Sequence, residues 1–202
     1  MIDITDYIQN NSAFVFELDD VLYPEKDYWL QVYYLFAQFI EYTEQTESAD
    51  LLAFMQQEYA KSGREDIFEK TAAQFGLPKK YKENFDLLQQ NARLPLRLLL
   101  FAPMLELLQA IKLAGKPVYL LLEGHPGQQL NKIRQMEWNG LETYLKVYFT
   151  AEILEGYQGV LQEIVLQSGL KSKDILVIGK QKSTKDLANF NTFGFLPVHN
   201  II

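Results

Sequence analysis

An acidic turn after a short apolar segment holds the residues best suited to chemistry. Phe14–Phe16 are β-forming apolar residues, and Glu17, Asp19 and Asp20 follow at once, ahead of Pro24. Acids spaced this closely repel one another, so the cluster indicates a bound cation or a catalytic use. Ligands bind at the carboxyl ends of strands in open α/β folds, so the turn is a candidate site. A solvated acidic turn is the simpler alternative.

A helical block follows the acidic turn. From about residue 27 to residue 85, apolar and aromatic residues recur at helical spacing. Within this block we predict helices at about 50–61, 65–75 and 79–90, separated by turns at Gly63 and at residues 76–78. We interpret the aromatic stripe that includes Trp29, Tyr33 and Phe36 as core that packs these helices together.

The second half of the chain alternates between helical and strand patterns. We predict strands at residues 118–122, 147–150, 175–179 and 195–198. We predict helices at residues 104–113, 127–136, 159–168 and 185–191. Continuously apolar strands that alternate with helices predict an α/β fold with a parallel sheet covered on both faces.

Composition excludes several classes of function. The chain has 202 residues, enough for one domain with an insertion. Its net charge of −7 argues against a nucleic-acid partner and against an anionic membrane. With no cysteine, it has neither a disulfide framework nor a thiol nucleophile, which is consistent with a cytoplasmic location. The N-terminal residues lack a signal-peptide pattern, and the most apolar run, residues 94–108, is too short and too interrupted to span a bilayer.

Several segments together resemble the motifs of haloacid dehalogenase-like (HAD) phosphohydrolases. Residues 16–24, F-E-L-D-D-V-L-Y-P, resemble the family's first motif, F-D-L-D-D-T-L-Y-P. Residues 121–133 resemble its second motif, V-T-N-G followed by Q-x-x-K-I. Residues 155–161 fall where the family has K-P-x-P-x-x-F, and residues 177–180 align with its V-G-D motif.

The resemblance implies a fold and a division of the chain. It implies a doubly wound parallel sheet, the HAD-like Rossmannoid core, from residues 1–24 and 96–202. It also implies that residues 25–95 form a small all-helical cap inserted after the first strand.

Most of the positions that are functional in the family carry a different residue here. Asp19 matches the family's general acid/base, but its nucleophilic aspartate is replaced by Glu17. The equivalents of the phosphate site are Leu122, where the family has threonine or serine, then Glu123 and Gly124, and Glu155 in place of lysine. The equivalents of the metal site are Glu17, Asp19, Lys180, Lys185 and Asp186, with Lys180 and Lys185 in place of aspartates.

These replacements remove what phosphoryl transfer requires. The reaction brings one anion to another, so Mg²⁺ and lysine must offset the charge. The extra methylene of Glu17 displaces its carboxylate by roughly 1 Å, which can cost on the order of 100-fold in rate. We therefore predict a catalytically silent pseudo-phosphatase that acts as a binding or regulatory module, with no cofactor. We also expect the Lys180 ammonium to occupy the metal's place and pair with Glu17 and Asp19.

Two alternatives remain open. The first is a low-activity phosphohydrolase that acts on a small phosphorylated metabolite through Asp19 or Glu17 and uses Mg²⁺. The second is a structural partner subunit that uses an exposed part of the aromatic stripe for recognition. The expected partner is an unknown small molecule or protein, and the sequence does not decide between monomer and dimer. His125, beside Gly124, is a weaker candidate for ligand contact, and we interpret His199 as structural.

Overall fold

The computed structural model describes residues 4–180 and 192–202. Its contacts divide the chain into two compact units. The first, the sheet unit, comprises Met1–Pro24, Leu99–Gln129 and Met136–Ile202. The second, the helical unit, comprises Glu25–Leu98 and Leu130–Gln135.

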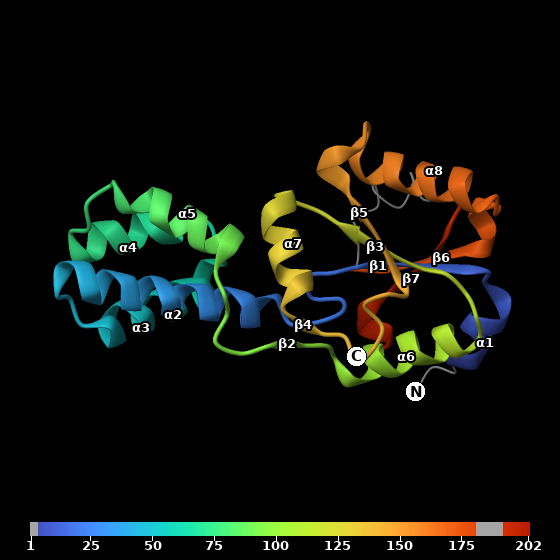
Figure 1. Cartoon of the computed structure of the whole chain (residues 1–202), viewed down its shortest axis with the longest axis horizontal. Coiled ribbons are helices and arrows are strands. Elements are labelled where there is room, and N and C mark those ends of the chain that lie inside the picture. The colour runs from blue at the N-terminus through green and yellow to red at the C-terminus, as the bar shows by residue number, and fades with distance from the viewer. Residues whose placement is uncertain (1–3, 181–191) are drawn as a thin grey trace. The chain divides into compact units, whose positions relative to one another are not determined.

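A parallel sheet forms the centre of the sheet unit. Its strand order is β5-β3-β1-β6-β7, and each described pairing is parallel (Figure 1). The strands are β1 (Ala13–Glu17), β3 (Val118–Leu122), β5 (Leu145–Phe149), β6 (Ile175–Gly179) and β7 (Gly194–Pro197). Every residue of β1, β3 and β6 is buried, which explains why these segments are continuously apolar in sequence apart from Glu17 at the end of β1. The predicted parallel α/β sheet is confirmed.

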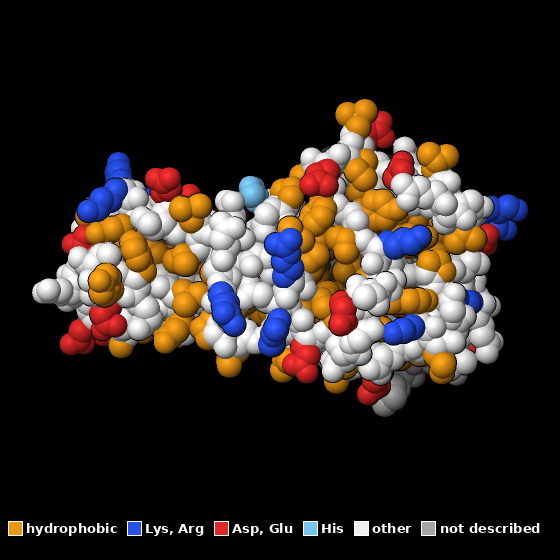
Figure 2. Space-filling view, viewed as in Figure 1, with side chains coloured by type: hydrophobic (Ala, Val, Ile, Leu, Met, Phe, Trp, Pro, Cys, Tyr) orange, Lys and Arg blue, Asp and Glu red, His pale blue; other side chains and the backbone are white. Residues whose placement is uncertain are grey.

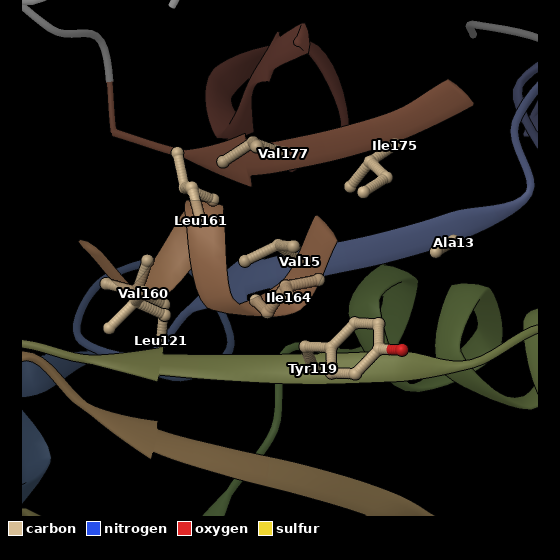
Figure 3. Packing of buried hydrophobic residues seen from close by; sticks show 9 residues of the cluster. All are labelled: Ala13, Val15, Tyr119, Leu121, Val160, Leu161, Ile164, Ile175 and Val177. Atoms are coloured by element: carbon tan, nitrogen blue, oxygen red, sulfur yellow. The ribbon is translucent and has the colours of Figure 1, made fainter. Parts of the chain in front are cut away.

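Helices cover both faces of this sheet. On one face, α8 (Gly156–Ser168) packs Val160, Leu161 and Ile164 against residues of β1, β3 and β6 (Figure 3). On the other face, the alternate strand residues Phe14, Leu176 and Ile178 line a small enclosed space with residues of α1 (Ile4–Asn10) and α6 (Ala102–Leu113). The unit therefore has three layers, as predicted for a doubly wound fold.

The remaining elements are shorter or join the two units along the chain. Helix α7 (Pro126–Arg134) follows β3, and its residues divide between the units. The two-residue strands β2 (Leu98–Leu99) and β4 (Met136–Glu137) were not predicted. Single 3₁₀ turns cover Thr150–Glu152, Ser172–Asp174 and Val198–Asn200. The helix predicted at residues 185–191 lies outside the described residues. No helix among those described has the length and apolar character needed to cross a membrane.

The helical unit contains α2 (Glu25–Glu44), α3 (Ser48–Ser62), α4 (Ile67–Phe75) and α5 (Tyr81–Asn91). Trp29 is 3% exposed, and Tyr33 and Phe36 are fully buried. The Phe36 and Phe85 ring centroids lie 5.0 Å apart with an edge-to-face orientation, so aromatic packing joins α2 to α5. The stripe is therefore core, as interpreted. The burial of these three side chains keeps them out of any recognition surface, whereas Tyr34 and Tyr42 of the same helix are 43% and 89% exposed.

Candidate functional site

The candidate residues gather at one edge of the sheet unit. Glu17 ends β1, Leu122 ends β3 and Gly179 ends β6. Because these neighbouring strands are parallel, the segments that follow them meet at the same edge of the sheet. The loop after β5 ends at Glu155, and the first turn of α8 then brings Tyr157 to this edge, where its hydroxyl contacts Glu17.

The carboxylate of Glu17 is buried and hydrogen-bonded on both oxygens. The residue is 6% exposed. The Tyr157 hydroxyl donates to Glu17 Oε1 at 2.7 Å, and the backbone N–H of Lys180 donates to Oε2 at 3.0 Å. The backbone of Gly179 packs tightly beside it, since a Cβ atom at that glycine would lie 2.6 Å from the Glu17 carboxyl carbon. Glu17 is thus held in a fixed position by these neighbours.

The Tyr157 hydroxyl is suited to remain a donor. Burial raises the pKa of Tyr157 well above its usual value, and the nearby charges of Glu17 and Glu123 raise it further. A hydroxyl that keeps its proton can serve the Glu17 carboxylate without adding a negative charge beside it.

Asp19, the acid that matches the first motif of the family, is also hydrogen-bonded on both oxygens. The Tyr23 hydroxyl donates to Oδ1 at 2.8 Å, and the Gln129 side-chain amide donates to Oδ2 at 3.0 Å. The same Gln129 nitrogen donates to the backbone oxygen of Glu123 at 2.7 Å. Because both Asp19 and Glu123 present acceptors, the NH₂ group of the Gln129 amide must face them. Asp19 is half-buried, which leaves it the more accessible of the two carboxylates.

Lys180 differs from the expectation in its partner. Its ammonium nitrogen lies 3.0 Å from Asp20 Oδ2, and it reaches Glu17 through its backbone N–H. The expectation was an ammonium paired with Glu17 and Asp19. The side chains of Lys180 and Asp20 are 47% and 51% exposed, so solvent screens the pair. Exposed pairs of this kind contribute about 0–1 kcal/mol to stability.

The equivalents of the phosphate site offer no side-chain donor. The Leu122 side chain is fully buried in the core. Glu123, Gly124 and Glu155 are exposed, and the two glutamates would repel a phosphate. Glu155 has a left-handed backbone, with φ of 65°, just before α8.

The described residues do not fit a magnesium site. Among them, no group of three or more His, Cys, Asp or Glu side chains lies close enough to hold an ion. Both Glu17 oxygens already accept hydrogen bonds, and the positive charge of Lys180 lies next to Asp20. Lys185 and Asp186 lie outside the described residues.

Sequence reasoning missed the side chains that hold the two carboxylates. Tyr157 follows Glu155 by two residues, Tyr23 lies in the first motif, and Gln129 matches the glutamine of the second motif. Their place in matched motifs was an available signal, but their roles depend on which loops meet in space. The histidines lie apart from these contacts: His125 is exposed at the start of α7, and His199 is exposed near the C-terminus.

Comparison with known proteins agrees with this architecture. No family model matches the chain, and no curated protein matches it by sequence. Among solved structures, a haloacid dehalogenase-like family hydrolase from Xanthomonas campestris superposes with a TM-score of 0.53 at 16% identity, covering 95% of this chain and 83% of that one. A defluorinating L-2-haloacid dehalogenase gives a TM-score of 0.54 at 11% identity, with coverages of 92% and 80%.

A further neighbour is the HAD-hydrolase YfnB from Bacillus subtilis, in its magnesium-bound form. It gives a TM-score of 0.52 at 13% identity, covering 85% of this chain and 79% of that one. At such low identity these likenesses show the fold alone. The chain therefore has the fold of the HAD-like hydrolases, and the resemblance seen in its motifs is confirmed at that level.

Proposed function

We propose that this chain is a binding or regulatory module built on the HAD-hydrolase fold, and that it does not transfer phosphoryl groups. The observation that carries the proposal is the state of Glu17. A nucleophile must approach its substrate in line and with a free oxygen. Here the carboxylate is buried, and its two oxygens accept hydrogen bonds from Tyr157 and from the backbone of Lys180.

The surroundings of Glu17 support the same proposal. A transferring phosphoryl group needs positive charge or hydrogen-bond donors to offset its own charge. The positions that match the family's donors are occupied by the apolar Leu122 and by the acidic Glu155. Catalytic groups that act as a unit do not regain their rate when only one of them is restored. The loss of several such groups therefore favours a site without turnover over a site with slow turnover.

A low-activity phosphohydrolase is the second candidate, and Asp19 favours it. Asp19 is at the position of the family's general acid/base, is half-buried, and has a fixed orientation. A general acid alone contributes about 10²–10⁴-fold to a rate. For Glu17 to act as the nucleophile beside it, the Glu17 carboxylate would have to leave its present hydrogen bonds.

Turnover assays separate the two candidates. Purified protein would be incubated with aryl phosphates, acyl phosphates and L-2-haloacids, with and without millimolar Mg²⁺. The haloacids are included because solved neighbours of the fold are described as haloacid dehalogenases. We expect no turnover above a buffer blank, and no gain from Glu17→Asp. Magnesium-dependent turnover that Asp19→Asn abolishes would establish the hydrolase instead.

A further inference from the structure

A pocket in the helical unit has features of a ligand site and lies apart from Glu17. It has a volume of about 390 Å³ and is lined by residues 91–97 together with Asn131 and Gln135. Small-molecule sites begin at roughly 300 Å³, so its size suits a small organic ligand. None of the family motifs discussed above includes residues 91–97.

The backbone that lines the pocket is held in one conformation by side-chain amides. Gln135 accepts a hydrogen bond from the Leu94 N–H at 2.6 Å and donates to the Ala92 oxygen at 2.8 Å. Asn131 donates to the same Ala92 oxygen at 3.0 Å. A wall fixed in this way loses little conformational entropy when a ligand binds.

The pocket carries positive charge, although the net charge of the whole chain is −7. Arg93 and Arg97 line it, and they are the charged side chains among its lining residues. Arg97 also donates to the backbone oxygen of Arg134 at 3.4 Å, so three of the four arginines of the chain lie in or beside this pocket. Figure 2 shows Lys and Arg side chains gathered over the segment that precedes β2.

These two arginines are available for an anion. Both are exposed, and neither forms an ion pair with any residue in the described part of the chain. The guanidinium group presents a planar set of donors that matches phosphate and carboxylate oxygens. Between the arginines, Pro95 and Leu96 are exposed, Leu96 by 71%, and they offer an apolar surface to the rest of a ligand.

We propose that this pocket binds a small organic anion. Arg93 and Arg97 hold its phosphate or carboxylate group, and its apolar body lies on Pro95 and Leu96. The proposal is independent of the function proposed above, since it involves none of the residues that hold Glu17.

The test is a calorimetric titration of the full chain at low ionic strength. The probes are phenyl phosphate, benzoate and inorganic phosphate, which separate the two acidic groups and the contribution of the apolar ring. We expect phenyl phosphate or benzoate to bind with a Kd of about 1 mM or tighter, and inorganic phosphate to bind more weakly. A preference for phenyl phosphate assigns a phosphate ligand, and a preference for benzoate assigns a carboxylate.

Matched variants locate the binding. The double variant Arg93→Ala with Arg97→Ala should weaken it by about tenfold or more, and replacement of both by lysine should weaken it less. Lys171→Ala with Lys173→Ala removes the same charge from exposed positions of the sheet unit and should leave the Kd within about twofold. If the double arginine variant does not fold, each single variant serves in its place.

Two results would overturn the proposal. One is the absence of saturable binding by any probe up to about 10 mM. The other is equal affinity in the variant with Arg93→Ala and Arg97→Ala and in the variant with Lys171→Ala and Lys173→Ala. That result would show that only the net charge of the chain matters.

Discussion

At the scale of single residues, Tyr157 gives Glu17 a hydrogen bond without a positive charge. The contact joins Tyr157 Oη to Glu17 Oε1 at 2.7 Å. A carboxylate that attacks phosphate must be relieved of its charge by cations, whereas one that serves structure needs only donors. The hydroxyl and the Lys180 N–H supply such donors.

Tyr157→Phe should therefore destabilise the fold. The change leaves a buried carboxylate oxygen without its hydroxyl donor, and such a loss costs about 1–3 kcal/mol. Urea unfolding at neutral pH measures the difference in the free energy of unfolding. A variant as stable as the wild type would show that the hydrogen bond contributes nothing to holding Glu17.

The alkaline limb of the stability curve should also report on Tyr157. Its pKa is raised in the folded state above the usual 10.0, so the Tyr157 hydroxyl keeps its proton in both the folded and the unfolded chain well below pH 10. Above pH 10 the unfolded chain releases the tyrosine proton while the folded chain keeps it. The free energy of unfolding then falls by about 1.4 kcal/mol for each pH unit because of this group.

Tyr157→Phe removes the contribution of this one hydroxyl to the decline in the free energy of unfolding with pH. Urea unfolding between pH 9 and 11 should show a shallower decline in the variant than in the wild type. Equal slopes in the two proteins would mean that Tyr157 ionises as readily folded as unfolded.

Tyr28 and Tyr33 offer a matched pair on one helix. Both are fully buried on α2, and the Tyr28 hydroxyl donates to the backbone oxygen of Gln89. The Tyr33 hydroxyl has no hydrogen-bond partner among the described residues, and burial raises its pKa well above the usual value. An unsatisfied buried hydroxyl costs free energy, so its removal should not destabilise.

We expect Tyr33→Phe to be neutral or stabilising by up to about 1–2 kcal/mol, and Tyr28→Phe to be destabilising by about 1 kcal/mol. Thermal and urea unfolding of the two variants provide the comparison, since each loses the same single oxygen. Equal losses of stability would show that the Tyr33 hydroxyl does have a partner.

At the scale of elements, the backbone of Gly179 at the end of β6 packs closely against the Glu17 carboxyl group, which leaves no room there for a side chain. A Cβ atom at Gly179 would lie 2.6 Å from the Glu17 carboxyl carbon and 2.7 Å from Oε1. Gly179→Ala should therefore destabilise by about 1–3 kcal/mol, because the added methyl displaces the carboxylate from its hydrogen bonds.

A double-mutant cycle identifies the cause. In a Glu17→Ala background the methyl has room, so Gly179→Ala should cost much less there than in the wild type. Gly159→Ala is the control, because its Cβ would lie 1.9 Å from the backbone oxygen of Leu154 and its cost should persist in both backgrounds. Additive costs for Gly179→Ala and Glu17→Ala would mean that the two residues do not confine one another.

The sequence predicted the elements that bury continuous apolar runs. The strands at residues 118–122 and 175–179 have the predicted bounds, because each is covered on both faces and so is apolar throughout. The two-residue strands β2 and β4 could not be predicted, since segments this short show no periodicity.

The site was predictable in its location and less so in its contacts. Parallel topology alone brings the end of β1 beside the ends of β3 and β6, so Glu17, Leu122 and Lys180 were expected near one another. Which side chain reaches Glu17 depends on the conformation of the loop before α8, where Glu155 and Gly156 both have positive φ. Such a conformation is not encoded by a local pattern, and Tyr157 was missed for that reason.

At the scale of the whole molecule, divalent cations should leave the stability of the wild-type protein unchanged. An ion that binds only the folded state raises stability by RT ln(1 + [L]/Kd), about 2.7 kcal/mol at one hundred times the Kd. The described residues do not form a magnesium site, so this stabilisation is not expected. The chain carries a net charge of −7, so salt of any kind screens its repulsion, and the control is NaCl at equal ionic strength.

Lys180→Asp should change this behaviour. It replaces the ammonium beside Asp20 with a further carboxylate close to Glu17, at the position that the motif resemblance aligns with a magnesium-binding aspartate. Repulsion among these acids should lower the melting temperature in NaCl, and millimolar Mg²⁺ should recover part of the loss by binding them. Thermal unfolding of both proteins in MgCl₂ and in matched NaCl makes the comparison. A magnesium-specific rise in the melting temperature of the wild type would show that its own side chains hold the ion, and it would favour the hydrolase over the silent module.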